Sequence, residues 1–367
     1  MGRKASLIAL AALAGGAVAG YAAERALMRR TRVEPPPDAT PLGTIAGDLE
    51  ELRGPEGVRL TVEAYGPAGA PQLVLAHGWL CTGRVWHEQV VGLADRFRIV
   101  TYDQPGHGRS SAPASGTYDV DMLGDALWTV IEEATGPGPV VLVGHSLGGM
   151  AVLNTVARHA DALHDRLAGA VLMSTLSRAR AGRAGLEVGL RGAASLERLV
   201  RRAAPTLRRP AVAGMAARLY SASSDLSNVL TRSLAVGPDT SPEVVDLVEQ
   251  QVIDSDPDVL LGLSEAVLGV DEDRGLAALT APTAIVVGAE DRIAPPVLSR
   301  RMASRCHHAE LHELPGVRHF PQLEAPEAVN AILARFATGE GDGDEDAHRG
   351  SGVAPDERAG RRGGEVA

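Results

Sequence analysis

The amino-acid sequence predicts an α/β fold in which a mostly parallel central sheet is flanked by helices and carries an inserted helical cap. Short apolar runs are the first observation, and they occur at 73–76, 99–102, 140–143, 170–173 and 284–287. Their near-continuous hydrophobicity is typical of strands covered on both faces. Helical patterns at 120–133 and 147–158 separate several runs, as connections between parallel strands require. Between 174 and 281 helical patterns continue without a buried strand, which indicates an insertion.

Composition excludes several classes of protein. Of the 367 residues, 45% are hydrophobic and 22% are charged, which is ordinary for a globular body of one or two domains. Aromatic residues make up 3% and the net charge is −10, so we expect no nucleic-acid partner. Cys81 and Cys306 are too few for a disulfide framework and lack metal-ligand spacing, so we expect both to be small core or loop residues.

The N-terminal segment, residues 1–33, differs from the rest of the chain. Two basic residues precede an uncharged stretch of 19 residues at 5–23, which is just long enough to cross a bilayer, and arginines follow it. Two interpretations remain open. An uncleaved membrane anchor is favoured because no turn-forming residue interrupts 20–30, whereas an A-x-A pattern at 17–19 fits a cleaved signal peptide and a secreted protein. We expect membrane association through this segment and leave the side of the membrane open.

The remaining boundaries follow from proline content and charge. Three prolines predict a stiff linker at 34–48. The core is then expected at 49–176 and 281–338, with an alternating, exposed antiparallel strand at 58–64 near the sheet edge. The last segment, 339–367, has almost no large apolar residue and is predicted to be a disordered tail.

The predicted cap, residues 177–280, has two charged parts. Its first third is rich in arginine, whereas 239–273 carries carboxylates throughout and no Lys or Arg. Solvated helix faces explain this pattern. A second interpretation is that the basic part contacts anionic lipid headgroups near the N-terminal segment.

One motif carries a defined chemistry. The run at 140–143 leads into Gly144-His145-Ser146-Leu147-Gly148, a G-x-S-x-G motif, and then into a helical pattern. A nucleophile on a strand-to-helix turn is held in a strained conformation, so both glycines must be small where backbones nearly touch. The helix N-terminus favours developing negative charge. We therefore predict that Ser146 is a nucleophile and that the Leu147 backbone N–H is one oxyanion-hole donor.

Several further motifs resemble those of the α/β-hydrolase superfamily, and the resemblance covers about 49–337. His77-Gly78-Trp79 is similar to the family's H-G segment, and 102–110 is similar to its D-x-x-G-x-G-x-S loop. The resemblance implies the α/β-hydrolase fold and places the second oxyanion-hole donor at Trp79. It also favours structural roles for the neighbouring polar residues His77, Asp103, His107 and His145.

His319 and Asp291 complete a predicted catalytic triad. A serine hydroxyl needs a base within hydrogen-bond reach and a carboxylate that fixes the tautomer of that base. His319 follows a strand pattern at 309–314 and matches the family's late histidine. Asp291 directly follows the apolar run at 284–287, with Glu290 as its competitor. The chain order Ser146, Asp291, His319 is the order that hydrolases of this fold use.

The sequence departs from the family pattern beside the predicted base. The family usually has glycine before this histidine, whereas here Arg318 precedes it. We expect the Arg318 side chain to point to solvent. If it turned inward, its charge would lower the pKa of the histidine.

These residues predict a serine hydrolase that cleaves a carboxylic ester through an acyl-enzyme, with no cofactor and no metal. The cap and the N-terminal segment favour an acyl-ester or lipid-like substrate, and the oligomeric state stays open. A serine nucleophile argues against epoxide hydrolases and haloalkane dehalogenases, which in this family use aspartate. Two alternatives remain: a cofactor-free perhydrolase or haloperoxidase with the same triad, and a hydrolase-fold protein that binds a ligand without turnover.

Overall fold

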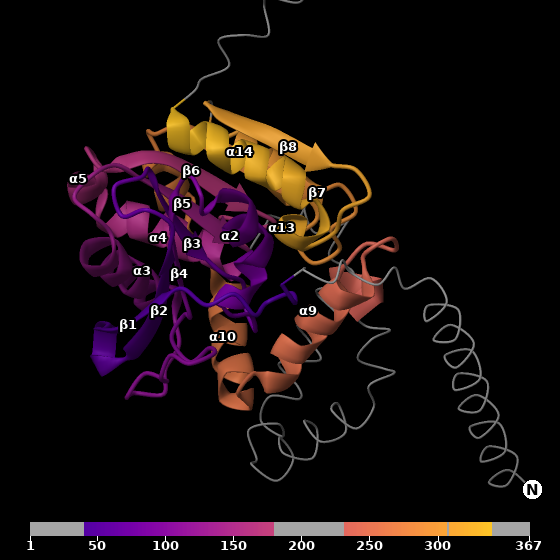
Figure 1. Cartoon of the computed structure of the whole chain (residues 1–367), viewed down its shortest axis with the longest axis horizontal. Helices are drawn as coiled ribbons and strands as arrows, with labels where there is room; N and C mark the ends of the chain where they lie inside the picture. The colour runs from indigo at the N-terminus through magenta and orange to yellow at the C-terminus, as the bar shows by residue number, and fades with distance from the viewer. Residues whose placement is uncertain (1–39, 180–230, 307, 340–367) are drawn as a thin grey trace, which may run out of the picture.

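A computed structural model describes residues 40–179, 231–306 and 308–339, and its centre is one eight-stranded sheet (Figure 1). The strand order is β1-β2-β4-β3-β5-β6-β7-β8. β2 is antiparallel to both neighbours and every other pair is parallel, which confirms the mostly parallel sheet. The strands are β1 (Asp48–Arg53), β2 (Arg59–Tyr65), β3 (Gln72–Ala76), β4 (Arg98–Tyr102), β5 (Val140–His145), β6 (Leu167–Met173), β7 (Thr283–Gly288) and β8 (Ala309–Leu314).

The five apolar runs of the sequence lie in the five central strands, β3 to β7. Every residue of β3, β5 and β7 is buried, as expected for strands covered on both faces. The alternating run lies in β2, which is antiparallel as predicted. Its predicted exposure is wrong, because β1 takes the sheet edge and most of β2 is buried.

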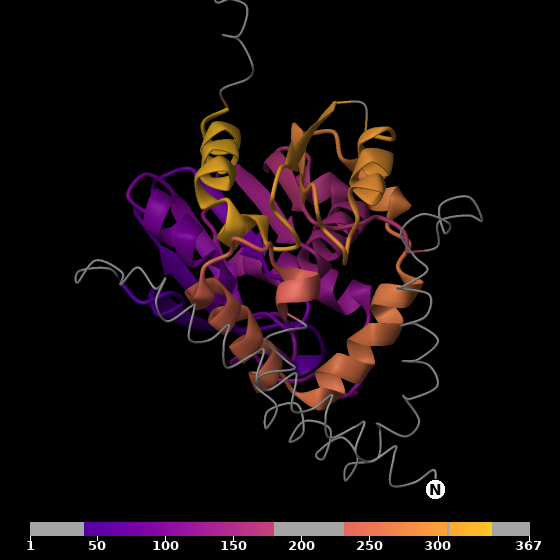
Figure 2. The same ribbon diagram turned by 90° about the vertical axis from the view of Figure 1, so that its right-hand side faces the viewer.

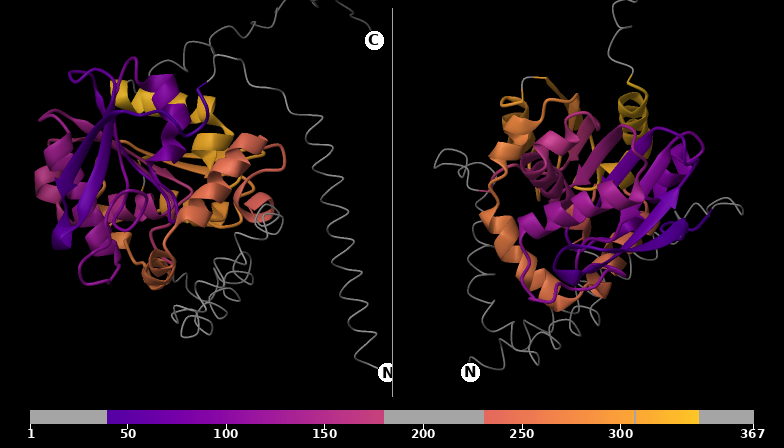
Figure 3. Two further views of the ribbon diagram at one scale, coloured as in Figure 1. Left: turned by 60° about the horizontal axis from the view of Figure 1, so that its bottom comes forward. Right: turned by 90° about the vertical axis from the view of Figure 1, so that its left-hand side faces the viewer.

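Helices cover both faces of the sheet (Figures 1 and 3). Side chains alternate along each strand, so Val74 packs in one buried cluster while Leu73 and Leu75 pack in the other. The first face holds α3 (Val120–Ala134), α4 (Leu147–Arg158), α5 (Ala160–Leu163) and α12 (Pro296–Ala303). The opposite face holds the short turn η2 (Gly83–Trp86) with α2 (His87–Leu93), α13 (Pro321–Glu324) and α14 (Pro326–Thr338). A second short turn, η1 (Pro55–Gly57), joins β1 to β2.

From residue 231 onward, the insertion between β6 and β7 is mostly helical. This part begins with a π-helical turn, η3 (Thr231–Ala235), and continues with α9 (Pro242–Asp254), α10 (Pro257–Gly269) and α11 (Asp273–Ala278). Figures 1 and 2 show α9 and α10 together at one end of the sheet. The end of α9 lies over the loop that follows β3, because Gln251 Oε1 accepts a hydrogen bond from the Thr82 N–H at 2.7 Å. α11 instead packs against α4, where a Cβ on Gly275 would lie 1.9 Å from the Leu153 carbonyl oxygen.

Residues 40–47, the end of the predicted linker, pack against the core. The Gly43 N–H donates to His87 Nδ1 at 3.0 Å, and Leu42 and Ile45 contact the cluster under α2. At the other end α14 finishes at Thr338, and Gly339 follows with φ 71°, where the tail was predicted to begin. Cys81 and Cys306 are buried and free, as expected.

Several predictions fall outside the described residues: the N-terminal segment, the start of the linker, the basic third of the cap and the tail beyond residue 339. Within the described ranges, no helix has the length and apolar character needed to cross a membrane.

Candidate active site

Ser146 occupies the sharp turn between β5 and α4. Its backbone has φ 52° and ψ −115°, a left-handed conformation that costs a non-glycine residue about 1–3 kcal/mol. The Ser146 N–H donates to the Met173 carbonyl oxygen at 2.8 Å, which ties the turn to the end of β6. The side chain is partly exposed at the carboxyl edge of the sheet. A strained turn that presents a serine hydroxyl is the geometry of a nucleophile elbow.

The glycines that flank Ser146 have no room for a side chain. A Cβ on Gly144 would lie 2.5 Å from the Gly148 carbonyl oxygen, and a Cβ on Gly148 would lie 2.1 Å from that of Ala76. Both distances are far below van der Waals contact. The sequence-based reason for the two glycines is confirmed.

His319 and Asp291 meet in a buried hydrogen bond. His319 Nδ1 lies 2.8 Å from Asp291 Oδ2, and the Asp291 side chain is fully buried. Asp291 Oδ1 accepts the backbone N–H groups of Ile293 and Ala294 at 2.8 and 2.9 Å. Burial by itself would raise the pKa of Asp291, but the charge and hydrogen bond of His319 and the two N–H groups together hold this pKa below its ordinary value. The carboxylate is therefore ionised and orients the imidazole.

No hydrogen bond joins the side chains of Ser146 and His319 in the described structure. They are linked through His145, whose ring lies 5.0 Å from the His319 ring, centroid to centroid. The structure thus brings His319 and Asp291 into contact and leaves Ser146 on the adjacent turn. Catalytic hydrogen bonds are often long before substrate binds, so this geometry is compatible with base catalysis.

The two predicted oxyanion-hole donors lie beside Ser146. Leu147 is the first residue of α4, so its N–H has no acceptor within the helix. Trp79 follows Gly78, where a Cβ would lie 3.3 Å from Ser146 Cβ. The Trp79 backbone N–H donates to no acceptor among the described residues. Neither N–H group has an acceptor in the described structure, as an oxyanion-hole donor requires.

Two further histidines near the site have both ring nitrogens engaged by backbone groups. His77 Nδ1 lies 2.8 Å from the Gly78 carbonyl oxygen, and His77 Nε2 accepts the Gln104 N–H at 2.9 Å. His107 bonds the Pro105 carbonyl oxygen and the Leu80 N–H at 3.1 and 3.2 Å. Burial lowers the pKa of His77 to about 4 and that of His107 to about 3. Both are neutral and structural, as predicted.

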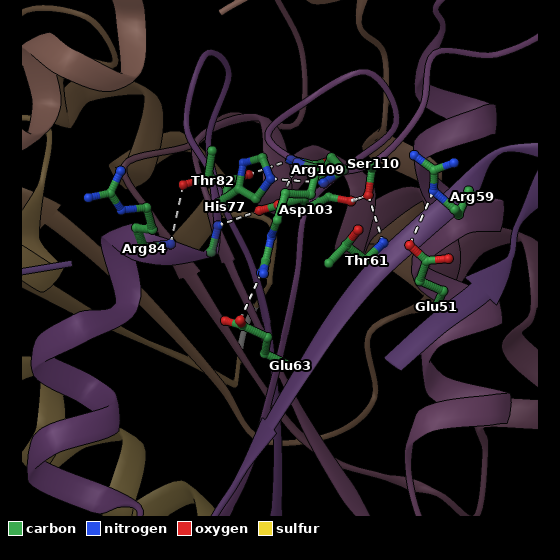
Figure 4. Close-up of polar contacts among 12 residues, drawn as sticks. Glu51, Arg59, Thr61, Glu63, His77, Thr82, Arg84, Asp103, Arg109 and Ser110 are labelled. Atoms are coloured by element: carbon green, nitrogen blue, oxygen red, sulfur yellow. Dashed lines mark hydrogen bonds and ion pairs between the residues drawn. The ribbon is translucent and has the colours of Figure 1, made fainter. Parts of the chain in front are cut away.

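The Asp103 carboxylate binds backbone N–H groups of two loops (Figure 4). Its two carboxylate oxygens accept the N–H groups of Gly83 and Arg109, each at 2.9 Å. Arg109 in turn pairs with Glu63 at 2.8 Å. The structural role predicted for Asp103 is confirmed. A cavity of about 480 Å³ lies beside this loop, but Ser146, Asp291 and His319 do not line it.

The predicted orientation of Arg318 is wrong. Its side chain is only 9% exposed, because the guanidinium turns inward and donates from Nη1 to the carbonyl oxygens of Arg232 and Val236. These carbonyl groups lie more than 80 residues away in sequence, where local patterns give no sign of them. Arg318 therefore binds η3 and the residue that follows it, inside the insertion, instead of facing solvent.

Thr175 is a site residue that the sequence reasoning missed. Its hydroxyl donates to the Ser146 carbonyl oxygen at 2.6 Å, and the side chain fills the space beside Gly149. Its position just after β6 is the available signal, since the carboxyl ends of adjacent parallel strands meet at one edge of a sheet. In the described ranges no group of three or more His, Cys, Asp or Glu residues could hold a metal ion.

The eight-stranded sheet and the serine on its strand-to-helix turn are features of a known protein family. The family model for the alpha/beta hydrolase fold matches residues 71–326. The chain belongs to this family, as the sequence motifs indicated, and its relatives include named esterases and hydrolases.

Among individual proteins, the chain is similar to RutD of Caulobacter sp. (strain K31), whose name assigns it carbamate hydrolysis. The two are 28% identical over 305 residues, which cover 81% of this chain and 98% of RutD. A bifunctional esterase/perhydrolase of Acinetobacter calcoaceticus is 37% identical over 122 residues, 33% of this chain and 42% of that protein. The solved structure of a thermophilic esterase from Thermogutta terrifontis matches with a TM-score of 0.64 at 24% identity, over 80% of this chain and 99% of that one.

Proposed function

We propose that this member of the α/β-hydrolase family cleaves carboxylic esters through an acyl-enzyme on Ser146, with His319 as the base and Asp291 as its orienting carboxylate. The observation that carries the proposal is the 2.8 Å bond between His319 and Asp291 on the loops beside the strained Ser146 turn. A histidine held by a buried carboxylate is the base that a serine hydroxyl needs.

Each step uses groups at this edge of the sheet. Ser146 Oγ attacks the ester carbonyl carbon while His319 Nε2 takes the hydroxyl proton, and the carbonyl oxygen becomes an oxyanion. The N–H groups of Leu147 and Trp79 are the proposed donors to that oxyanion. His319 then gives the proton to the departing alkoxide. In deacylation, water loses a proton to His319 and attacks the acyl carbon. The bond from the acyl carbon to Ser146 Oγ then breaks, His319 returns the proton to Oγ, and the carboxylic acid leaves.

The test is hydrolysis of p-nitrophenyl acetate together with covalent labelling by a fluorophosphonate probe. The wild-type chain is expected to do both, and Ser146→Ala to do neither. Ser299→Ala is the matched control, since Ser299 is fully buried in α12 without a side-chain hydrogen bond, and it should behave as wild type. Retained turnover in Ser146→Ala would exclude Ser146 as the nucleophile. Absence of both activities in the wild type would favour a protein that binds a ligand without turnover.

Perhydrolysis is a second candidate, favoured by the esterase/perhydrolase relative. It would use the same acyl-enzyme, with hydrogen peroxide in place of water as the attacking nucleophile, and would release a peracid. Peracid formation from acetate ester and peroxide, compared with ester hydrolysis in the same preparation, separates the two activities. Peracid production at a rate well below that of ester hydrolysis would exclude perhydrolysis as the main activity.

An acyl-ester or lipid-like substrate remains part of the proposal, as does membrane attachment through residues 1–33. Rates over p-nitrophenyl esters of increasing chain length test the substrate. A preference for acetate over all longer chains would contradict a lipid-like substrate.

A further inference from the structure

The loop that carries His319 is bonded to part of the insertion, namely η3 and the residues that lead from it to α9. We call residues 315–320 the histidine loop and residues 231–240 the return segment. The His319 N–H donates to the Ala235 carbonyl oxygen at 2.9 Å, and Arg318 Nη1 donates to that of Val236 at 2.8 Å. Arg292, next to Asp291, also donates to this segment, at the Ser233 carbonyl oxygen, 2.9 Å away. Backbone oxygens of the return segment therefore hold both loops of the proposed acid and base.

Glu324, in α13, joins the same two elements with its carboxylate. On the side of the histidine loop, Oε1 accepts the Phe320 N–H at 2.9 Å and Oε2 accepts the Arg318 N–H at 3.2 Å. On the side of the return segment, Oε2 accepts the Gly237 N–H at 2.6 Å and the Thr240 hydroxyl at 3.3 Å. Together with Ala235, this carboxylate fixes three consecutive backbone N–H groups, those of residues 318, 319 and 320.

A carboxylate satisfies this arrangement better than an amide of the same shape. All four partners are donors and they approach both oxygens, so both positions must be acceptors. A glutamine amide supplies one oxygen and one NH₂ group, and the NH₂ group would face an N–H donor. With the amide oxygen at the Oε2 position, the contact to the Phe320 N–H is lost and becomes repulsive. In the reverse orientation, the three contacts at Oε2 are lost.

The return segment and the histidine loop are closely packed against each other. A Cβ on Gly237 would lie 2.6 Å from the Gly316 carbonyl oxygen in the histidine loop and 3.0 Å from Glu324 Oε2. A shift of the return segment is therefore transmitted directly to the backbone around His319.

We infer that Glu324 is a positioning residue for His319 and that, with Arg318, it makes the placement of this base depend on how the return segment is seated. The inference rests on the proposed function, in which His319 is the base. Glu324 lies outside the reacting atoms and acts through the backbone of residues 318–320. Loss of its carboxylate should lower the chemical rate at each site more than it changes substrate binding or the number of folded sites.

The experiment uses the full chain as wild type, Glu324→Gln and Glu327→Gln, an exposed glutamate one turn along as the matched control. The endpoint of fluorophosphonate labelling counts competent sites, and its rate reports how well Ser146 is activated. For Glu324→Gln we expect an unchanged endpoint, a labelling rate and kcat about 10- to 100-fold lower, and KM for p-nitrophenyl acetate within about two-fold of wild type. Glu327→Gln should match wild type throughout.

A second variant keeps the test decisive if Glu324→Gln does not fold. Arg318→Ala removes the guanidinium contacts to the return segment and leaves the backbone contacts of Glu324 in place. Its labelling rate per site should fall by about ten-fold.

The outcomes distinguish failure of this inference from failure of the proposed function. A wild-type labelling rate in Glu324→Gln overturns the inference alone. If Glu324→Gln does not fold, a wild-type labelling rate in Arg318→Ala does the same. So does a reduced endpoint with an unchanged rate for the sites that do label, because this indicates a merely structural role. A wild-type protein that neither labels nor hydrolyses esters overturns the proposed function, and this inference with it.

Discussion

His145 Nε2 lies 2.7 Å from the backbone carbonyl oxygen of His319. The residue beside the nucleophile therefore supports the loop of the proposed base. His145 is buried, and burial lowers its pKa to about 3, so it is neutral and carries its proton on Nε2. Its Nδ1 has no hydrogen-bond partner in the described structure. The serine turn and the histidine loop are thus joined by one neutral hydrogen bond.

Replacing His145 should separate the two loops. His145→Phe keeps a ring but leaves the His319 carbonyl oxygen unpaired, which we expect to cost about 1–3 kcal/mol in the free energy of unfolding and to lower the hydrolysis rate. His145→Gln can still donate from its amide and should lose less of both. Urea unfolding and p-nitrophenyl acetate kinetics measure the two effects. Equal losses in the two variants would contradict a role for the donor.

Stability should fall in mild acid because three histidines are buried as neutral groups. The pKa values of His77, His107 and His145 lie at about 4, 3 and 3, well below the unfolded value near 6.5. The unfolded chain therefore binds more protons than the folded chain between pH 6.5 and 4. The contribution of these neutral histidines to the stability of the folded state is complete above pH 6.5 and is lost as the pH falls through this range. Each histidine contributes a slope of up to about 1.4 kcal/mol per pH unit.

Urea unfolding at a series of pH values between 7 and 4 measures this slope. His107→Gln removes one of the three groups and should reduce the slope by about 1.4 kcal/mol per unit, even if the variant is less stable at pH 7. A slope identical to wild type would mean that His107 is not buried in its neutral form.

The strain at Ser146 predicts that a glycine variant is more stable than an alanine variant, the reverse of the usual order. Glycine ordinarily costs about 0.5–1 kcal/mol relative to alanine through chain entropy. At φ 52° and ψ −115° the alanine side chain keeps the strain and glycine relieves it. We expect Ser146→Gly to unfold with a free energy about 1 kcal/mol higher than Ser146→Ala, with both inactive. A more stable alanine variant would show that the turn is relaxed.

Asp291 and Glu290 should differ sharply as partners of His319. Asp291 contacts His319 Nδ1, whereas the Glu290 side chain is 49% exposed and lies 4.0 Å from Arg318 Nε. Asp291→Asn leaves the imidazole in the wrong tautomer and should lower kcat by up to about 10⁴-fold, by analogy with serine proteases. Glu290→Gln should change kcat by less than about two-fold. Comparable losses in both variants would reassign the acid.

Local sequence patterns were sufficient for the parts of the fold that depend on neighbouring residues. The apolar run at 140–143, the following glycines and the helix at 147–158 specify a strand, a turn and a helix in that order. Their predicted positions therefore match β5 and α4 closely. The loops of Asp291 and His319 follow β7 and β8 for the same reason.

Features that depend on distant partners were not predictable in this way. β1 (Asp48–Arg53) has a single buried residue, because an edge strand with exposed side chains needs no apolar pattern. The inward turn of Arg318 depends on carbonyl groups at residues 232 and 236, and the role of Glu324 depends on donors from two loops. No periodicity or motif encodes such contacts.

β8 is the last strand in chain order that the structure describes, and it lies at an edge of the sheet. The proposed site is therefore completed late in the synthesis of the chain. Among the described strands β8 pairs with β7 alone, and His319 and Glu324 follow it, so they leave the ribosome after the serine turn and Trp79. A nascent chain that ends before residue 309 carries the strained serine without its proposed base. Under the proposed mechanism, the nucleophile is made early, and hydrolysis begins only after β8, α13 and α14 have docked on the sheet.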